Sequence, residues 1–176
     1  MIDPRAGELL EIRGTPVGDP RWSEVEEELG TKVPSEYKRI VERFGDYYWN
    51  RCFYVLNPFS PKQYLNLFSG GRMILEAEEI MRQESPELYV LPLYPEQGGL
   101  LPWGVSDFDD TFFWLTKGKA DEWPTVVKGR SGNIEIHFGA CDLFLHLVAT
   151  GRIQSGILPR VGNASTRQPS QGRMPR

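Results

Sequence analysis

Residues 99–138 read GLLPWGVSDFDDTFFWLTKGKADEWPTVVKGRSGNIEIHF and contain four short apolar runs, over 99–105, 111–115, 125–128 and 134–138. Runs of this length, rich in aromatic and β-branched residues and bounded by Gly, Pro and Asp, are typical of β-strands. Four such strands joined by short turns predict a mostly antiparallel sheet.

The last of these runs indicates how the sheet is buried. Ile134, Ile136 and Phe138 alternate with Glu135 and His137. Successive side chains of a strand point to opposite faces, so this pattern predicts one face in the core and one in water.

Two amphipathic helices and a further strand are expected ahead of the sheet. The first helix opens at Asp19-Pro20, where the missing N–H of proline costs nothing, and ends at Gly30. The second covers residues 35–44 and ends at Gly45. The run RCFYVL over 51–56 predicts a strand. Apolar residues recur at helical spacing at Trp22, Val25 and Leu29, and again at Tyr37, Ile40, Val41 and Phe44.

Two more helices are expected, over residues 73–83 and 141–149. The apolar face of the first comprises Met73, Ile74, Ala77, Ile80 and Met81, and that of the second Leu143, Phe144, Leu147 and Val148. We expect these apolar residues to be used in the core, with the later helix covering the sheet.

These elements predict an α+β fold in a single domain, a mixed, mostly antiparallel sheet flanked by helices. A chain of 176 residues with 40% hydrophobic residues suffices for one sizeable core. The domain is expected over residues 19–158, after an N-terminal arm over 1–18. Residues 159–176 have no apolar pattern and are expected to form a disordered basic tail.

The acidic residues all lie in the first 150 positions. Those positions carry 15 basic and 24 acidic residues, a net charge of −9, against −4 for the whole chain. Such a surface repels phosphate backbones and attracts basic partners, so autonomous nucleic-acid binding is not expected. The N-terminus is acidic where a signal peptide is basic, and no apolar run is long enough to span a membrane, which predicts a cytoplasmic protein.

Few residues are of the kinds that perform catalysis. Cys52 and Cys141 are far apart and have no partner at metal-ligand spacing, so we expect two buried free thiols. His137 and His146 have no serine or cysteine motif nearby, and Gly-x-Ser-x-Gly is absent. No cofactor, no metal and no enzyme activity are therefore expected.

The turn at 106–110 carries three carboxylates, Asp107, Asp109 and Asp110. They could bind a hard cation, stabilise the turn through side-chain hydrogen bonds, or contact a partner. A metal loop needs more oxygen ligands and a closing Glu, which is missing at that spacing. The other two interpretations are compatible, and we take all three residues as partner-binding candidates.

Four further partner-binding candidates lie on loops. Glu122 and Trp123 stand where a loop enters a strand; such a tryptophan is usually a core residue, but an aromatic beside acids also suits a contact with a basic partner. Asp46 and Tyr48 belong to a second aromatic loop, where packing under the sheet edge and a binding role both stay open.

Two groups of motifs occur in a fixed order over about residues 20–150. The first group is Trp22-x-x-Val25-Glu26-x-x-Leu29-Gly30, Val33-Pro34-Ser35-x-Tyr37-Lys38 and Phe44-Gly45. The second is a Gly-x-x-Pro-Trp-Gly strand, an acidic turn and an aromatic strand, at 99–104, 107–110 and 112–114. Together, the two groups resemble the signatures of the SUKH superfamily.

The resemblance implies an α+β fold and a family whose bacterial members are largely immunity proteins against polymorphic toxins, while its fungal relatives act as regulatory scaffolds. In many bacterial relatives the turn after the Pro-Trp-Gly strand resembles Thr-Asp-Asn-Gly-Asp. Here it reads Ser-Asp-Phe-Asp-Asp, so Asp107 and Asp110 match while Phe108 and Asp109 differ.

Our first hypothesis is a non-enzymatic immunity protein that binds and neutralises a cognate toxin domain, expected to be basic, encoded nearby and in the first instance a nuclease. Acidic residues would raise the association rate, and aromatic anchors would slow dissociation. The alternative is a regulatory or scaffolding module that binds a cellular partner and has no toxin. The oligomeric state stays open.

Overall fold

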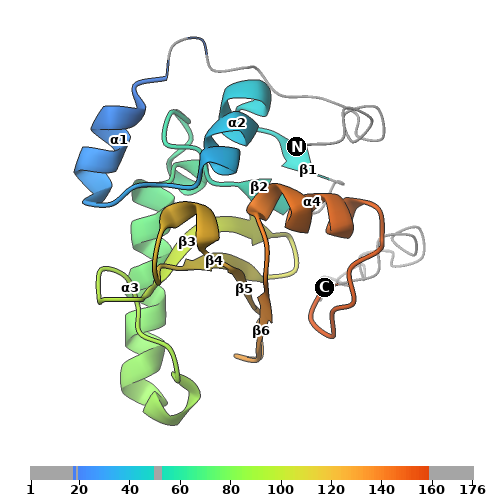
Figure 1. Cartoon of the computed structure of the whole chain (residues 1–176). Coiled ribbons are helices and arrows are strands. Elements are labelled where there is room, and N and C mark those ends of the chain that lie inside the picture. The colour runs from blue at the N-terminus through green and yellow to red at the C-terminus, as the bar shows by residue number, and fades with distance from the viewer. Residues whose placement is uncertain (1–17, 19, 50–52, 159–176) are drawn as a thin grey trace, which may run out of the picture.

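The computed structural model describes residues 18, 20–49 and 53–158, and its centre is a six-stranded antiparallel sheet (Figure 1). The strands lie in the order β1-β2-β3-β4-β5-β6, so each pairs with its neighbours along the chain. Their bounds are Tyr48–Trp49, Phe53–Val55, Leu100–Ser106, Thr111–Leu115, Thr125–Lys128 and Ile134–His137. The predicted α+β class is confirmed.

Four α-helices flank this sheet in the described part of the chain: α1 (Trp22–Leu29), α2 (Ser35–Phe44), α3 (Ser69–Glu84) and α4 (Cys141–Ala149). Helices α1, α2 and α4 lie over one face and α3 lies on the other (Figure 1). Short 3₁₀ turns are η2 (Gln63–Leu65), η3 (Pro86–Leu88) and η4 (Ala120–Glu122).

Alternation along the strands divides the buried side chains between two cores. The larger core joins α1, α2 and α4 to the sheet and is rich in aromatic rings, among them Tyr37, Trp103, Phe112, Trp114 and Phe144. The smaller core lies under α3 and is built around Leu93, Leu100, Phe113 and Val126, with Ile74 and Leu75 of α3 packed against it.

The ends of α1 and α2 confirm the predicted boundaries. Gly30 and Gly45 follow the two helices with φ angles of 73° and 55°, in the region that favours glycine. Helix α4 also has its predicted bounds, but Leu143 is exposed and Leu145 is buried in its place. The apolar stripe of α4 is therefore rotated relative to the predicted one.

Helix α3 differs more from its prediction. It begins at Ser69 and not at Met73, and the residues expected in the core are largely on the solvent side: Met73, Ala77, Ile80 and Met81 are exposed. The inward positions include Glu78, whose carboxylate accepts a hydrogen bond from Lys128 of β5. This ion pair occupies the space that the apolar face was expected to fill.

The edge strand β6 is covered less than its alternation predicts. Ile134 packs against the smaller core, but Ile136 on the same side is exposed, and so is Phe138, which follows the end of β6. Both lie at the open edge of the sheet, where no further strand or helix of the described chain covers them.

Some predictions fall outside the described residues. The predicted arm does so except for Gly18, and the predicted basic tail and Cys52 do so entirely. Among the described helices, none is both long and apolar enough to cross a membrane.

Candidate partner-binding surface

The β3–β4 turn is locked by hydrogen bonds between its two ends. The Ser106 amide donates to the Asp110 carbonyl at 2.9 Å, and the Ser106 hydroxyl donates to the Asp110 carboxylate at 2.8 Å. The same hydroxyl accepts the amides of Phe108 and Asp110, both at 3.1 Å. Asp110 is buried, and this burial raises the pKa of its carboxyl group. Asp110 therefore stabilises the turn, and its carboxylate is not available to a partner.

The hydrogen-bonded turn holds the residues between its two ends at the protein surface. Phe108 is 48% exposed although it is a large apolar side chain. Asp109 has a φ angle of 63°, which asparagine and aspartate tolerate better than most residues. Its carboxylate lies 3.4 Å from Arg130 of the β5–β6 hairpin, and both side chains are largely exposed.

Tyrosine rings continue this surface across β1 and β2. Tyr48 donates a hydrogen bond to Asp107, and its ring stacks on that of Tyr54 with 4.5 Å between the centroids. Burial raises the pKa of Tyr54, and the nearby Asp107 and Tyr64 raise it further, so these side chains lie together. Tyr64 of η2 is 64% exposed. We call these residues the Tyr48 surface: Tyr48, Tyr54, Tyr64, Asp107, Phe108 and Asp109.

Asp46 lies near this region but holds a loop in place. Its carboxylate accepts hydrogen bonds from the Asn57 side-chain amide at 2.8 Å and from the Ser60 hydroxyl at 2.7 Å. With both oxygens engaged inside the protein, Asp46 acts as a support for the loop that follows β2.

The structure does not bring Glu122 and Trp123 to the same place. They belong to the loop between β4 and β5, at the other end of β4, so roughly 15 Å of extended strand separates them from the acidic turn. Trp123 is only 4% exposed; its ring packs 6.2 Å from that of Trp114, and its Nε1 donates to the Gly118 carbonyl at 3.3 Å. Of the two alternatives for Trp123, the structure shows the core position: the ring folds back into the larger core and is not accessible to a partner.

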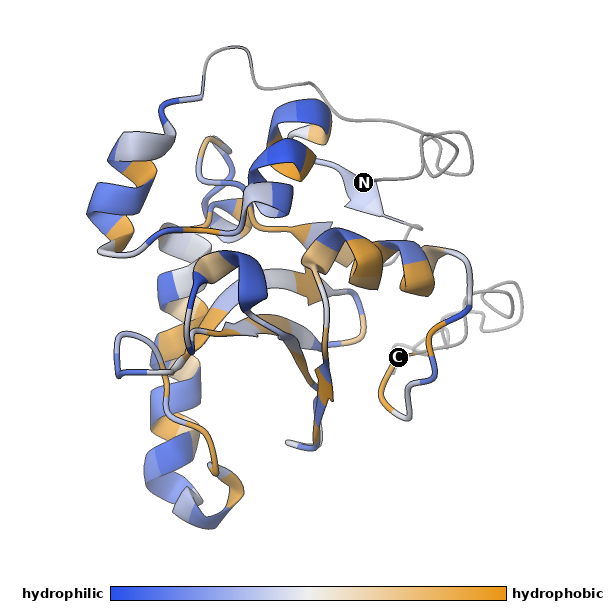
Figure 2. Ribbon diagram, viewed as in Figure 1, coloured by the Kyte–Doolittle hydropathy of each residue, from blue (hydrophilic) through white to orange (hydrophobic). Residues whose placement is uncertain are grey.

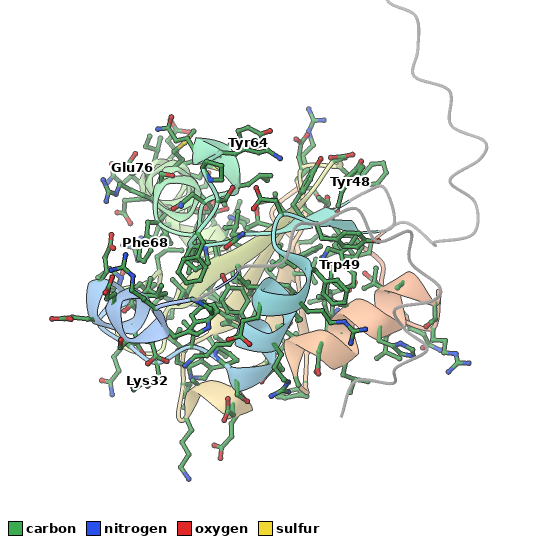
Figure 3. All side chains as sticks on the ribbon, turned by 90° about the horizontal axis from the view of Figure 1, so that it is seen from above. Lys32, Tyr48, Trp49, Tyr64, Phe68 and Glu76 are labelled. Carbon is green, nitrogen blue, oxygen red and sulfur yellow. The ribbon has the colours of Figure 1, made fainter. Side chains whose placement is uncertain are left out.

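Figure 3 shows how the tyrosines at the two ends of this surface are placed. Tyr64 and Glu76 lie at the α3 side of the molecule, whereas Tyr48 of β1 lies across from them; its neighbour Trp49 is buried. The Tyr48 surface thus extends from the β3–β4 turn towards the start of α3. Glu122 is exposed, but it lies outside this surface.

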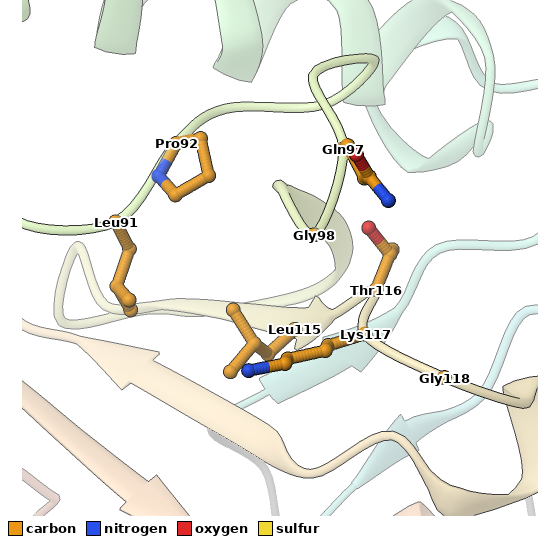
Figure 4. Close-up of a pocket in the computed structure, with 8 residues that line it drawn as sticks. All are labelled: Leu91, Pro92, Gln97, Gly98, Leu115, Thr116, Lys117 and Gly118. Carbon is orange, nitrogen blue, oxygen red and sulfur yellow. The ribbon is translucent and has the colours of Figure 1, made fainter.

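The described residues contain no group of three His, Cys, Asp or Glu side chains that could hold a metal ion. Cys141 is buried, which raises the pKa of its thiol well above the usual range. A hollow of about 560 Å³ lies between the loops 91–98 and 115–118 (Figure 4). Lys117 is the one ionisable residue in its lining, so it offers no acid–base pair.

Three members of the Tyr48 surface are not among the predicted candidates. Tyr54 could have been found, because Phe53 and Val55 alternate with it and point inward. Phe108 could also have been found, as an apolar residue placed in a tight acidic turn. No pattern around Tyr64 indicates its exposure.

Comparisons with family models, with curated proteins and with solved structures find no match to this chain.

Proposed function

We propose that this chain is a non-enzymatic immunity protein that acts in the cytoplasm by binding and neutralising a cognate bacterial toxin domain. The resemblance to the SUKH superfamily suggests this class. The observation that carries the proposal is the exposed ring of Phe108, held between Asp107 and Asp109 on a turn that hydrogen bonds make rigid.

A rigid turn suits tight binding because little conformational entropy is lost when it meets a partner. Phe108 and the neighbouring tyrosines supply the large, amphipathic contact area that is typical of binding hot spots. Asp107 and Asp109 are oriented in advance by Tyr48 and Arg130, so their charges can meet Lys and Arg side chains of a basic toxin. Inhibition would be stoichiometric, by covering the toxin's active site.

The test is co-expression with the toxin domain encoded beside this gene, a nuclease in the first instance. The wild-type chain is expected to restore growth, and Phe108→Ala is expected to raise the Kd at least about 30-fold, the effect of losing a hot spot of about 2 kcal/mol. Calorimetry measures the Kd directly.

The matched control is Phe138→Ala, which removes a ring from the far edge of the sheet that is 85% exposed, against 48% for Phe108. It is expected to leave both growth and affinity unchanged. Recovery of ordinary cellular proteins that dissociate as salt rises, with no toxin bound, would instead support the regulatory or scaffolding alternative.

A further inference from the structure

Helix α3 presents its apolar residues to solvent and a charged residue to the core. Met73 and Ile80 are 53% and 58% exposed, and Ala77 and Met81 are exposed beside them. Figure 2 shows α3 at the outside of the molecule, with hydrophobic and hydrophilic segments alternating along it. We call Met73, Glu76, Ala77, Ile80, Met81 and Glu84 the α3 outer face.

A buried ion pair sets the rotation of this helix. Lys128 of β5 donates to the Glu78 carboxylate and to the Tyr89 hydroxyl, the latter at 2.7 Å, and its ammonium group lies 4.2 Å from the centre of the Tyr89 ring. A buried ion pair often stabilises a fold no better than apolar residues of the same size. Stability alone would therefore favour an apolar residue at position 78 and the apolar stripe turned inward.

The start of α3 is fixed as well. A Cβ on Gly70 would lie 2.7 Å from the Tyr64 carbonyl oxygen, so the helix approaches η2 as closely as glycine permits. The Asn66 side chain accepts the amides of Phe68 at 2.9 Å and Ser69 at 3.3 Å. Held at its start and its middle, the helix keeps its apolar face in water.

The charges on the outer side of α3 are net negative. Apart from the buried Glu78, the helix carries the acidic residues Glu76, Glu79 and Glu84 and the basic residues Arg72 and Arg82. Arg82 is engaged by Glu79 and Glu96, each at 2.6 Å, whereas Glu76 and Glu84 are exposed and have no ion pair within the described chain. An apolar strip bordered by free carboxylates complements a basic, amphipathic segment.

We propose that the α3 outer face is a second docking surface, which binds a basic amphipathic helix of a partner protein. The apolar side of that helix packs on Met73, Ala77 and Ile80, where the methionine adapts its shape and the alanine permits close approach. Its Lys and Arg side chains meet Glu76 and Glu84. A second copy of this chain fits poorly, because it would bring two sets of these carboxylates together.

The α3 outer face shares no residue with the Tyr48 surface. This proposal can therefore be tested independently of the proposed immunity function. The probe is a fluorescein-labelled 14-residue peptide with Leu on one side of a helix and Lys on the other. Fluorescence anisotropy of the full chain at low salt measures its binding, and the same peptide with Glu for Lys serves as the reference.

The Lys peptide is expected to bind and the Glu peptide is not. Met73→Ser/Ile80→Ser and, separately, Glu76→Lys/Glu84→Lys are each expected to weaken binding at least about tenfold, since the first removes apolar contact and the second reverses charge. Phe138→Ser is the matched control, an exposed apolar residue elsewhere, and should change affinity less than twofold.

Three results would overturn the proposal. The first is that both double variants bind the Lys peptide with unchanged affinity. The second is that only Phe108→Ala loses binding, which would show that the peptide binds to the Tyr48 surface. The third is a dimer in sedimentation that Met73→Ser/Ile80→Ser dissociates, which would assign the face to a second copy of the chain.

Discussion

On one face of the sheet three helices enclose a core of aromatic rings, and on the other a single helix is held by a buried ion pair. In the first core, edge-to-face contacts such as that of Tyr37 with Trp114, 4.8 Å between centroids, give each ring a defined neighbour. In the second, polar bonds fix the position of α3. This comparison indicates that the three-helix face mainly stabilises the fold, whereas the α3 face leaves apolar side chains of the helix exposed to solvent.

The largest expected effect comes from two adjacent residues of β4. Phe112 and Phe113 are both fully buried but point to opposite faces. Phe112→Ala should cost about 4–5 kcal/mol, because the surrounding rings cannot collapse into the cavity, and Phe113→Ala about 3 kcal/mol. Urea unfolding followed by circular dichroism measures both. Equal losses of stability in the two variants would contradict the proposed difference between the two faces. If an alanine variant fails to fold, the Phe→Leu variants at the two sites provide the same test.

The ion pair is the next test. Lys128→Met leaves Glu78 buried without its partner and should destabilise the fold by about 3 kcal/mol. The double variant Glu78→Leu/Lys128→Met should return to within about 1 kcal/mol of the wild type, because an apolar pair replaces the ionic one. Chemical unfolding of the single and double variants gives the coupling. A double variant that stays about 3 kcal/mol less stable than the wild type would show that the ionic pair stabilises α3 better than an apolar pair does, contrary to the comparison.

A smaller effect is expected at the rim of the aromatic core, where charge lies near water. Burial favours the neutral form of Glu26, but hydrogen bonds from Lys32 and Lys38 outweigh it and lower the pKa of the carboxyl below its ordinary value of 4.5. This ionised group ties α1 to α2. Its stabilisation is present above pH 4.5 and is lost as the pH falls through the lowered pKa.

Glu26→Gln should therefore cost about 2 kcal/mol at neutral pH, the value of charged hydrogen bonds, and the difference from wild type should shrink below pH 4.5. Thermal melts across this range follow it. Glu24→Gln, in an exposed pair with Arg21, is the control and should change little at any pH. A cost for Glu26→Gln that does not vary with pH would mean that packing, not charge, joins the two helices.

Local patterns in the sequence predict the elements well where a stripe and a stop signal coincide, as at residues 35–44 before Gly45. They do not predict which way an amphipathic helix faces. The spacing of Met73, Ala77 and Ile80 shows that they share a side, but the residue that turns this side outward, Lys128, lies 50 positions from its partner Glu78. Such a contact is visible only in the folded chain.

The candidate site shows the same limit. The sequence predicts the acidic turn because two predicted strands border it. The exposure of Phe108 depends on the hydrogen bonds that the Ser106 hydroxyl makes with Asp110 and Phe108, and these are visible only in the folded chain. Trp123 was expected on a rim because acids precede it, yet a residue at a loop end can fold back, and this one reaches the larger core beside Trp114. Neighbours in sequence do not determine that choice.

The smallest expected effect tests the exposed side of α3. Ile80→Gln should change the free energy of unfolding by no more than about 0.5 kcal/mol, because an exposed helix position loses no buried area and glutamine is a good helix former. Ile74→Gln, six residues earlier on the inward side, is the matched variant and should cost about 2 kcal/mol. Urea unfolding of the pair measures the contrast between the two sides. A similar loss at both positions would mean that Ile80 is covered in the folded protein, and α3 would then resemble the helices on the aromatic face.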